Sequence, residues 1–136
     1  MRATYPKSLE HLRSRGVMLT LQRRIILEFL HRHPGHWTAE QIHRALRSRY
    51  ETLSRATVYN TLELLCEHSE IHALRIRRDV THFDTNTQPH HHFLCLRCGE
   101  LTDLDIRCPI HARSHLGKRR IERMVAVFEG TCEKCL

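Results

Sequence analysis

The stretch SRATVYNTLELLCEHS, residues 54–69, has the pattern of an amphipathic helix that follows a capping residue. Serine at position 54 favours the N-cap of a helix, because its hydroxyl oxygen can accept a hydrogen bond from a backbone N–H group of the first turn. The apolar residues that follow recur at the spacing of one helix face; they are Val58, Leu62 and Leu65. The pattern predicts a helix from Arg55 with its apolar face in a protein core.

Two further helices are predicted upstream of this one. Thr20 is a suitable N-cap for the segment LQRRIILEFL, and the sequence His-Pro-Gly at residues 33–35 ends that segment. Thr38 begins the segment TAEQIHRALRSRY, where Thr38 and Gln41 have the spacing of a capping box. Both segments carry apolar residues at helical spacing, so each is expected to pack one face against the core.

Residues 71–84 predict a β-hairpin after the three helices. The runs IHALRIR and VTHFD alternate as short strands around the sequence RDV. Three helices followed by a two-stranded wing is the order of a winged helix-turn-helix domain, in which a later helix enters the major groove of DNA. A helical bundle with a solvated charged face is the alternative.

The early residues of the last helix are the candidate DNA contacts. Arg and Asn side chains can bond a base edge at two positions, and a Tyr ring can pack on a thymine methyl group. The candidates are Arg55, Thr57, Tyr59, Asn60 and Thr61. Cys66, near the end of the same helix, is predicted to be a small core residue rather than a ligand.

The charge of the chain is positive and unevenly distributed. The net charge is +7 and the pI is near 9.5. Residues 1–88 contain 14 Lys/Arg and 9 Asp/Glu, whereas residues 89–136 contain 8 and 6. A basic first half suits a polyanionic partner such as DNA. The chain has no secretion signal and no apolar run of about 18 residues, so we expect a cytoplasmic protein that does not enter a membrane.

The cysteines point to metal or redox chemistry. Cys95-x-x-Cys98 and Cys132-x-x-Cys135 are two pairs with the spacing of zinc knuckles, and Gly99 lets the first knuckle close tightly. Four thiolates in two such pairs make a closed tetrahedral zinc site of the structural type. A pair of redox dithiols is the alternative.

The histidine run that precedes Cys95 needs a different explanation, because a site with four thiolates is already full. In an extended segment His90 and His92 point to one side and His91 to the other. Two imidazoles on one side form half of a second site suited to Fe, Mn, Zn, Ni or Co. Asp84 and Asp103 are candidate oxygen ligands. An exposed polar loop is the alternative.

The order and spacing of these motifs resemble the ferric uptake regulator (Fur) family. The residues that carry the resemblance cover nearly the whole chain; they are LTLQRRIILEFL, HWTAEQIHRAL, SRATVYNTLELL, THFDTNTQPHHHFLCLRCGELTDL and GTCEKC. The resemblance implies an α+β fold, with a winged-helix DNA-binding domain over residues 1–84 and a small α/β dimerisation and metal-binding domain over residues 85–136. It also implies a homodimeric, metal-dependent repressor of double-stranded operator DNA.

The resemblance assigns two metal sites in each chain. It implies a structural Zn²⁺ held by Cys95, Cys98, Cys132 and Cys135, in agreement with the spacing. It implies a regulatory site at the domain junction, whose ligands are His36, Asp84, His90, His92 and Asp103. A basic residue before the second family helix often reaches the minor groove; that position is Met18 here, and Arg15 is expected to replace it.

The aspartates at positions 84 and 103, and the Asn after Tyr59, are more similar to the peroxide-sensing branch of the family. In that branch Fe²⁺ (or Mn²⁺) occupies the regulatory site, and peroxide oxidises a ligand histidine, here His36 or His90. Iron-uptake regulation and zinc- or manganese-uptake regulation are the alternatives. A dimerisation helix is expected to start near Cys108.

Two other classes of protein are disfavoured. A zinc hydrolase would need a motif such as His-Glu-x-x-His, which the sequence lacks, so we expect no enzyme. A zinc-ribbon nucleic-acid-binding module would explain the cysteines, but it would not explain His36, Asp84, Asp103 or the winged-helix pattern.

Overall fold

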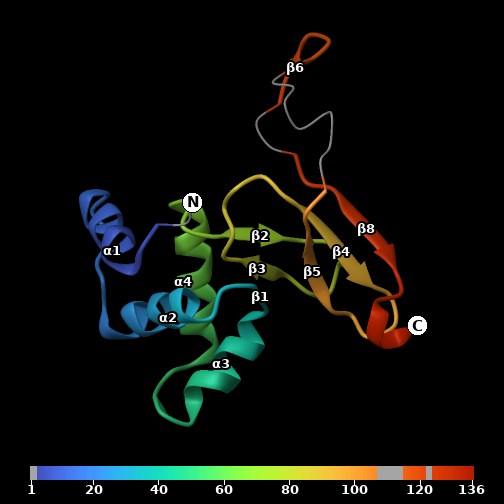
Figure 1. Ribbon diagram of the computed structural model, residues 1–136. Helices are drawn as coiled ribbons and strands as arrows, with labels where there is room; N and C mark the ends of the chain where they lie inside the picture. Colours follow the sequence, from blue (N-terminus) through green and yellow to red (C-terminus); the bar gives the residue numbers. More distant parts are fainter. Residues whose placement is uncertain (1–2, 107–114, 122–123) are drawn as a thin grey trace. The chain divides into compact units, whose positions relative to one another are not determined.

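The computed structural model describes residues 3–106, 115–121 and 124–136 (Figure 1). The chain divides into two compact units, residues 1–87 and residues 88–136. Helices predominate in the first unit and strands in the second, and the predicted α+β class is confirmed. The helix expected to start near Cys108 lies outside the described residues.

Four helices make up most of the first unit. They are α1 (Tyr5–Ser14), α2 (Leu21–Arg32), α3 (Ala39–Arg47) and α4 (Arg55–Glu67). The last three are the helices predicted from the sequence. The first was not predicted; it has Pro6 in its first turn, where a missing N–H group costs little, and it buries Leu12 completely.

The three predicted N-caps are all formed. The Thr20 hydroxyl accepts a hydrogen bond from the Arg23 amide at 3.3 Å, and the Ser54 hydroxyl accepts one from the Thr57 amide at 3.0 Å. Thr38 and Gln41 form the complete capping box, with amide-to-side-chain bonds of 3.2 and 2.8 Å. The starts of α2, α3 and α4 are therefore fixed by local sequence.

Replacing Thr38 with alanine should lower the free energy of unfolding of the first unit by about 1 kcal/mol, because the first turn of α3 loses its hydroxyl acceptor. Urea unfolding followed by the fluorescence of Trp37, the single tryptophan of the chain, measures the change. Thr4→Ala is the matched control, since the N-cap of α1 makes no side-chain bond and should lose little. Equal losses in both variants would rule out the capping explanation.

A small antiparallel sheet completes the first unit. Its order is β1 (His36–Trp37), β3 (His82–Asp84) and β2 (His72–Leu74). The predicted hairpin of β2 and β3 is confirmed. Strand β1 was not predicted, and its pairing places His36 directly opposite Asp84.

One hydrophobic core joins the helices to this sheet. It contains Leu12, Ile25, Ile26, Leu27, Leu30, Ile42, Leu46, Leu53, Val58, Leu62, Leu65, Ile71 and Phe83. Cys66 is half buried and packs against this core, as the sequence predicts. Because α4 and the strands bury side chains in the same core, the start of α4 is held rigidly at the surface.

The second unit is built on a three-stranded sheet. The central strand β4 (His91–Cys95) pairs antiparallel with β5 (Leu101–Leu104) and parallel with β8 (Val127–Gly130). The short strands β6 (His115–Leu116) and β7 (Arg119–Arg120) pair with each other, and a 3₁₀ helix spans Glu133–Cys135. No helix among the described residues is both long enough and apolar enough to span a membrane.

Candidate metal centres

Four cysteine side chains come together in the second unit. Cys95 ends β4, Cys98 follows in a turn, and Cys132 and Cys135 belong to the C-terminal 3₁₀ turn. Their sulfur atoms all lie within 4.8 Å of one another. The Cys98 and Cys132 sulfurs are 3.8 Å apart, which is the edge length of a tetrahedron with Zn–S bonds of about 2.3 Å. The donor set fits a structural Zn²⁺ ion.

Backbone groups favour the thiolate of Cys95. The amides of Cys98 and Cys132 donate to the Cys95 sulfur at 3.5 and 3.4 Å, and these bonds lower the pKa of Cys95 to about 6. The neighbouring Cys132 side chain instead raises the pKa of Cys135 to about 12. Only a bound cation would hold all four side chains as thiolates, which is the form that coordinates zinc.

Contacts across the two cysteine pairs brace this cluster. Gly99, at φ 74°, closes the first knuckle with a bond from its amide to the Cys95 carbonyl. Arg97 donates to the Cys135 carbonyl at 2.8 Å. Lys134 lies 3.3 Å from both carboxylate oxygens of Glu100, which raises the pKa of Lys134. The spacing of the cysteines gave no sign of these two side-chain contacts, because the partners come from opposite knuckles.

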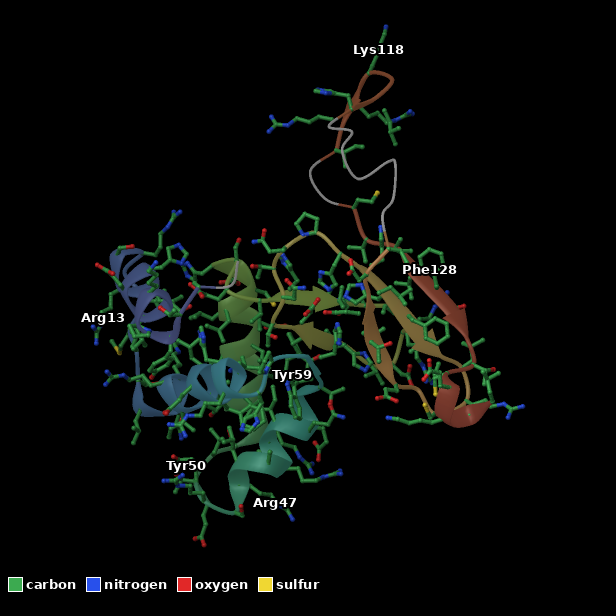
Figure 2. All side chains as sticks on the ribbon, viewed as in Figure 1. Arg13, Arg47, Tyr50, Tyr59, Lys118 and Phe128 are labelled. Carbon is green, nitrogen blue, oxygen red and sulfur yellow. The ribbon has the colours of Figure 1, made fainter. Side chains whose placement is uncertain are left out.

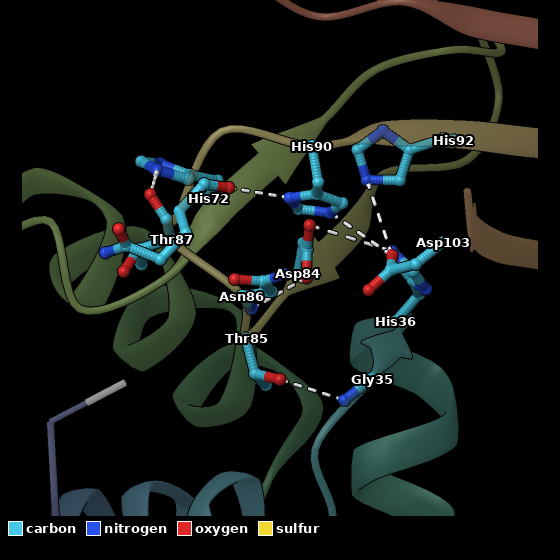
Figure 3. A network of polar contacts seen from close by, with 11 residues as sticks. Gly35, His36, His72, Asp84, Thr85, Asn86, Thr87, His90, His92 and Asp103 are labelled. Carbon is cyan, nitrogen blue, oxygen red and sulfur yellow. Dashed lines mark hydrogen bonds and ion pairs between the residues drawn. The ribbon is translucent and has the colours of Figure 1, made fainter. Parts of the chain in front are cut away.

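The first unit holds a buried histidine–aspartate pair. His36 Nε2 lies 3.6 Å from Asp84 Oδ2, and the two side chains are 7% and 2% exposed (Figure 3). The Asn86 amide donates to Asp84 Oδ1 at 2.8 Å, and Gly35 and Thr85 fix the adjacent backbone through two further bonds. A buried carboxylate is stable only when cations or donors surround it, so this pair suits a metal ion.

The second unit holds a separate cluster of two histidines and an aspartate. The His90 and His92 rings have centroids 4.3 Å apart, and their Nε2 atoms lie 3.2 and 3.9 Å from Asp103 Oδ1. His90 Nδ1 lies 2.7 Å from the Gln88 carbonyl, so Nδ1 donates there and Nε2 is the ring nitrogen that faces Asp103. A cation between an imidazole acceptor and a carboxylate would stabilise both.

The alternation along β4 separates the third histidine from this cluster. His91 packs its ring 6.3 Å from the ring of Phe128, at 85°, and is 2% exposed. His92 instead lies opposite Asp103 in the register of β4 and β5. The predicted facing of His90 and His92 to one side and of His91 to the other is confirmed, and the alternative of an exposed polar loop is wrong, because His91 and His92 are buried in β4.

The candidate DNA contacts are unequally accessible; Tyr59, which is labelled in Figure 2, is 44% exposed. Arg55, Tyr59 and Asn60 are exposed on α4, and Arg15 is exposed at the end of α1. Thr57 is half buried, with its hydroxyl 2.8 Å from that of Ser54. Thr61 is 2% exposed and donates to the Thr57 carbonyl, so its predicted contact with DNA is wrong: the side chain is buried and its hydroxyl bonds its own helix.

An ion pair at the start of α4 was not predicted from the sequence. Arg55 Nε lies 3.1 Å from Glu40 Oε2, and Arg55 Nη2 donates to Glu40 Oε1 at 3.2 Å. The two residues are 15 positions apart and belong to different helices. No local pattern signals such a contact, because it depends on the packing of α3 against α4.

Comparison with known proteins gives one clear family. The model of the "Ferric uptake regulator family" matches residues 14–120. The peroxide operon regulator of Bacillus subtilis (strain 168) is 37% identical over 97 residues, which cover 71% of this chain and 67% of that protein. The chain therefore spans about two thirds of the length of the curated relatives that it matches.

Solved structures show the same fold. The ferric uptake regulator Fur of Helicobacter pylori has a TM-score of 0.76 at 22% identity, covering 98% of this chain and 94% of its own. PerR from Streptococcus pyogenes, described in connection with peroxide sensing and gene regulation, has a TM-score of 0.57 at 28% identity, covering 100% and 95%. The fold is thus shared with a ferric uptake regulator and with a PerR protein.

Proposed function

The chain belongs to the ferric uptake regulator family, and from that premise we propose that it is a metal-dependent repressor that binds operator DNA and senses hydrogen peroxide. The B. subtilis relative is named for a peroxide operon. The observation that carries the proposal is the placement of aspartates beside histidines, Asp84 at His36 and Asp103 at His90. The resemblance links aspartates at these two positions to the peroxide-sensing branch.

The four cysteines would hold one structural Zn²⁺ per chain. The second unit is short, and the buried hydrophobic side chains among its described residues are only those of Leu94, Cys95 and Leu101. A core of this size contributes little stability, so zinc coordination would supply much of the free energy of folding.

A second ion, Fe²⁺ or Mn²⁺, would be bound jointly by His36, Asp84, His90, His92 and Asp103. The first unit offers two of these side chains and the second unit offers three, so neither set alone fills the five or six positions that such ions prefer. An ion that needs both sets binds only the arrangement of the two units in which both can reach it. Metal binding would thereby select one spacing of the α4 helices in a homodimer, and with it one spacing of DNA half-sites.

Peroxide sensing would depend on the same ligands. When bound, Fe²⁺ supplies the electrons that convert hydrogen peroxide into an oxidant at the site. The chain holds the imidazoles of His36 and His90 there, and the Gln88 carbonyl orients the His90 ring by accepting a hydrogen bond from its Nδ1. Addition of an oxygen atom to either ring weakens it as a ligand, so the metal and then the DNA would be released.

Oxidation of one histidine residue tests the proposal. The full chain, loaded with Zn²⁺ and either Fe²⁺ or Mn²⁺, is treated with dilute hydrogen peroxide, digested with trypsin and sequenced by tandem mass spectrometry. We expect one added oxygen atom on His36 or His90 in the iron-loaded protein and none in the manganese-loaded protein.

The same two tryptic peptides carry internal controls. Peptide 33–44 also contains His33 and His43, and peptide 79–97 also contains His82 and His91; these should stay unmodified. Oxidation spread evenly over all the histidines would mean nonspecific damage. No oxidation with iron, together with intact metal-dependent DNA binding, would favour regulation of iron, zinc or manganese uptake instead.

A further inference from the structure

We propose that Glu40 determines DNA sequence specificity by holding Arg55 in position for a base edge while opposing contact with DNA of the wrong sequence. The inference rests on the proposed DNA-binding function and concerns residues of the first unit alone. It assigns a role to an acidic residue that is not a candidate metal ligand and lies in the part of the chain with the larger net positive charge.

The two side chains meet in a fork-to-fork geometry. Arg55 Nε lies 3.1 Å from Glu40 Oε2, and Arg55 Nη2 donates to Glu40 Oε1 at 3.2 Å. Both carboxylate oxygens are therefore matched with different nitrogens of the planar guanidinium group. This geometry fixes the orientation of the Arg55 side chain as well as neutralising its charge.

The backbones behind this pair are fixed as well. Glu40 is the second residue of α3, whose start is held by the capping box of Thr38 and Gln41. Arg55 is the first residue of α4, whose start is held by the Ser54 cap. The two helices also share the hydrophobic core. The ion pair is thus built on two rigid helix ends, and its geometry does not depend on a loop.

The pair is too exposed to serve mainly as a stabiliser of the fold. The side chains of Arg55 and Glu40 are 70% and 47% exposed, and ion pairs with this exposure contribute little to folding stability. The pair matters more for DNA binding than for folding stability. A free arginine side chain loses rotamer freedom when it binds a base. An arginine already held by a carboxylate loses less on meeting DNA.

Arg55 keeps enough donors to bind a base while it remains paired. A guanidinium group has five N–H donors, and the contacts with Glu40 use two of them. The remaining donors include those of Nη1, so Arg55 can reach the two acceptors, O6 and N7, on the major-groove edge of guanine. At a matching guanine, Arg55 would bond the base edge while it stays paired with Glu40.

The Glu40 carboxylate also repels the DNA backbone. Residues 1–88 contain 14 Lys/Arg and 9 Asp/Glu, and this excess of positive charge favours binding to any DNA sequence. A carboxylate at the start of α3 lowers that general attraction and keeps Arg55 from pairing with a nearby phosphate. Where Arg55 meets guanine, its hydrogen bonds to the base offset the repulsion between Glu40 and the DNA backbone. At other bases these bonds are missing and the repulsion remains.

The test compares binding to specific and nonspecific DNA. Duplexes that bind the full chain, loaded with Zn²⁺ and Mn²⁺, are selected from a random library. Affinities for the selected duplex and for a scrambled duplex are then measured by fluorescence anisotropy at several salt concentrations. For Glu40→Gln we expect tighter binding to the scrambled duplex. The preference for the selected duplex should fall by between about twofold and about tenfold, and this loss should be mainly at one base pair.

Two further variants separate positioning from repulsion. Glu40→Asp keeps the negative charge but shortens the reach to Arg55, so it should lose base preference without a gain in scrambled-DNA affinity. In an Arg55→Ala background, Glu40→Gln should no longer change the base preference. Glu28→Gln is the matched control, because Glu28 pairs with Arg32 at 2.7 Å on α2 with similar exposures of 43% and 71%, and it should leave both affinities unchanged.

The outcomes distinguish this inference from the proposed function. If the wild-type chain selects DNA but Glu40→Gln changes the preference by less than about twofold, the role of Glu40 is wrong. The same holds if Glu40→Gln has an equal effect with and without Arg55, or if Glu28→Gln has the same effect. If the wild-type chain selects no DNA with either metal, the proposed function itself fails and the inference fails with it.

Discussion

Replacing Cys95 with serine is expected to abolish zinc binding and to unfold residues 88–136. Cys95 has a fully buried side chain at the end of β4, and its sulfur accepts hydrogen bonds from both cysteine knuckles. A serine hydroxyl is not ionised at neutral pH and does not replace a thiolate ligand of zinc. Structural zinc sites contribute about 10–16 kcal/mol to the folding of small domains, which exceeds what a core this small supplies.

Zinc content by elemental mass spectrometry and hydrogen exchange of β4 measure this result. The wild-type chain should contain one Zn²⁺ that resists mild chelation, and Cys95→Ser should contain none and should exchange the β4 amides rapidly. Cys66→Ser is the control, since Cys66 packs in the first unit and should leave both the zinc and the exchange unchanged. A Cys95→Ser chain that kept one zinc ion and protected amides would rule out the four-cysteine site.

Replacing His90 with alanine is expected to abolish metal-dependent DNA binding while the zinc remains. His90 lies against Asp103, and its tautomer is set by the Gln88 carbonyl, which are the features of an oriented metal ligand. Loss of even an indirect partner of a ligand typically weakens metal affinity about 10–100-fold, so loss of a ligand should weaken it at least about 100-fold. Without the ion, the two units would no longer be held in the DNA-binding arrangement.

Three measurements on the same preparation separate the outcomes. Titration with Mn²⁺ should show weaker binding in His90→Ala, anisotropy should show no Mn²⁺-dependent binding to the selected duplex, and the zinc content should stay at one ion per chain. His68→Ala, at the C-cap of α4, belongs to neither ligand set and should behave like the wild type. If His90→Ala still bound the duplex in a Mn²⁺-dependent way, the regulatory site would have been assigned wrongly.

The two expected results act on different parts of the same sequence run. His90 and His92 precede Cys95 by a few residues, and β4 carries the chain from the proposed regulatory ligands to the proposed zinc ligands. Loss of zinc should therefore disturb the regulatory histidines, whereas loss of the regulatory ion should leave the zinc in place. Cys95→Ser should therefore lose the zinc and also disturb Mn²⁺ binding, whereas His90→Ala should lose only tight Mn²⁺ binding.

Much of the first unit could be predicted because its signals are local. Thr20, Thr38 and Ser54 cap helices through bonds to residues three positions away, so the sequence alone determines where α2, α3 and α4 begin. The β2–β3 hairpin likewise follows from alternation around one turn. Helix α1 was missed although Tyr5, Leu9 and Leu12 recur at helical spacing, because its apolar residues are few and its Thr4 cap makes no side-chain bond.

The two cysteine pairs and the pair His90 and His92 were predictable for a related reason, whereas His36 was implied only by the family resemblance. A Cys-x-x-Cys knuckle and an alternating pair of histidines are set by the geometry of a few consecutive residues. That the two knuckles meet follows from the number of thiolates that zinc requires. Which atoms orient each ligand did not follow, since the Gln88 carbonyl at His90 and the Asn86 amide at Asp84 depend on the path of the backbone.

The helix starts, the wing, the cysteine pairs and the facing of the histidines could thus be predicted, because each depends on residues only a few positions apart. Four features emerged only in the folded chain: the pairing of β1 with β3, the parallel pairing of β8 with β4, the burial of Thr61 and the contact of Glu40 with Arg55. These features join segments that are distant in the chain. Their partners are chosen by the packing of a shared core, and no local pattern encodes that choice.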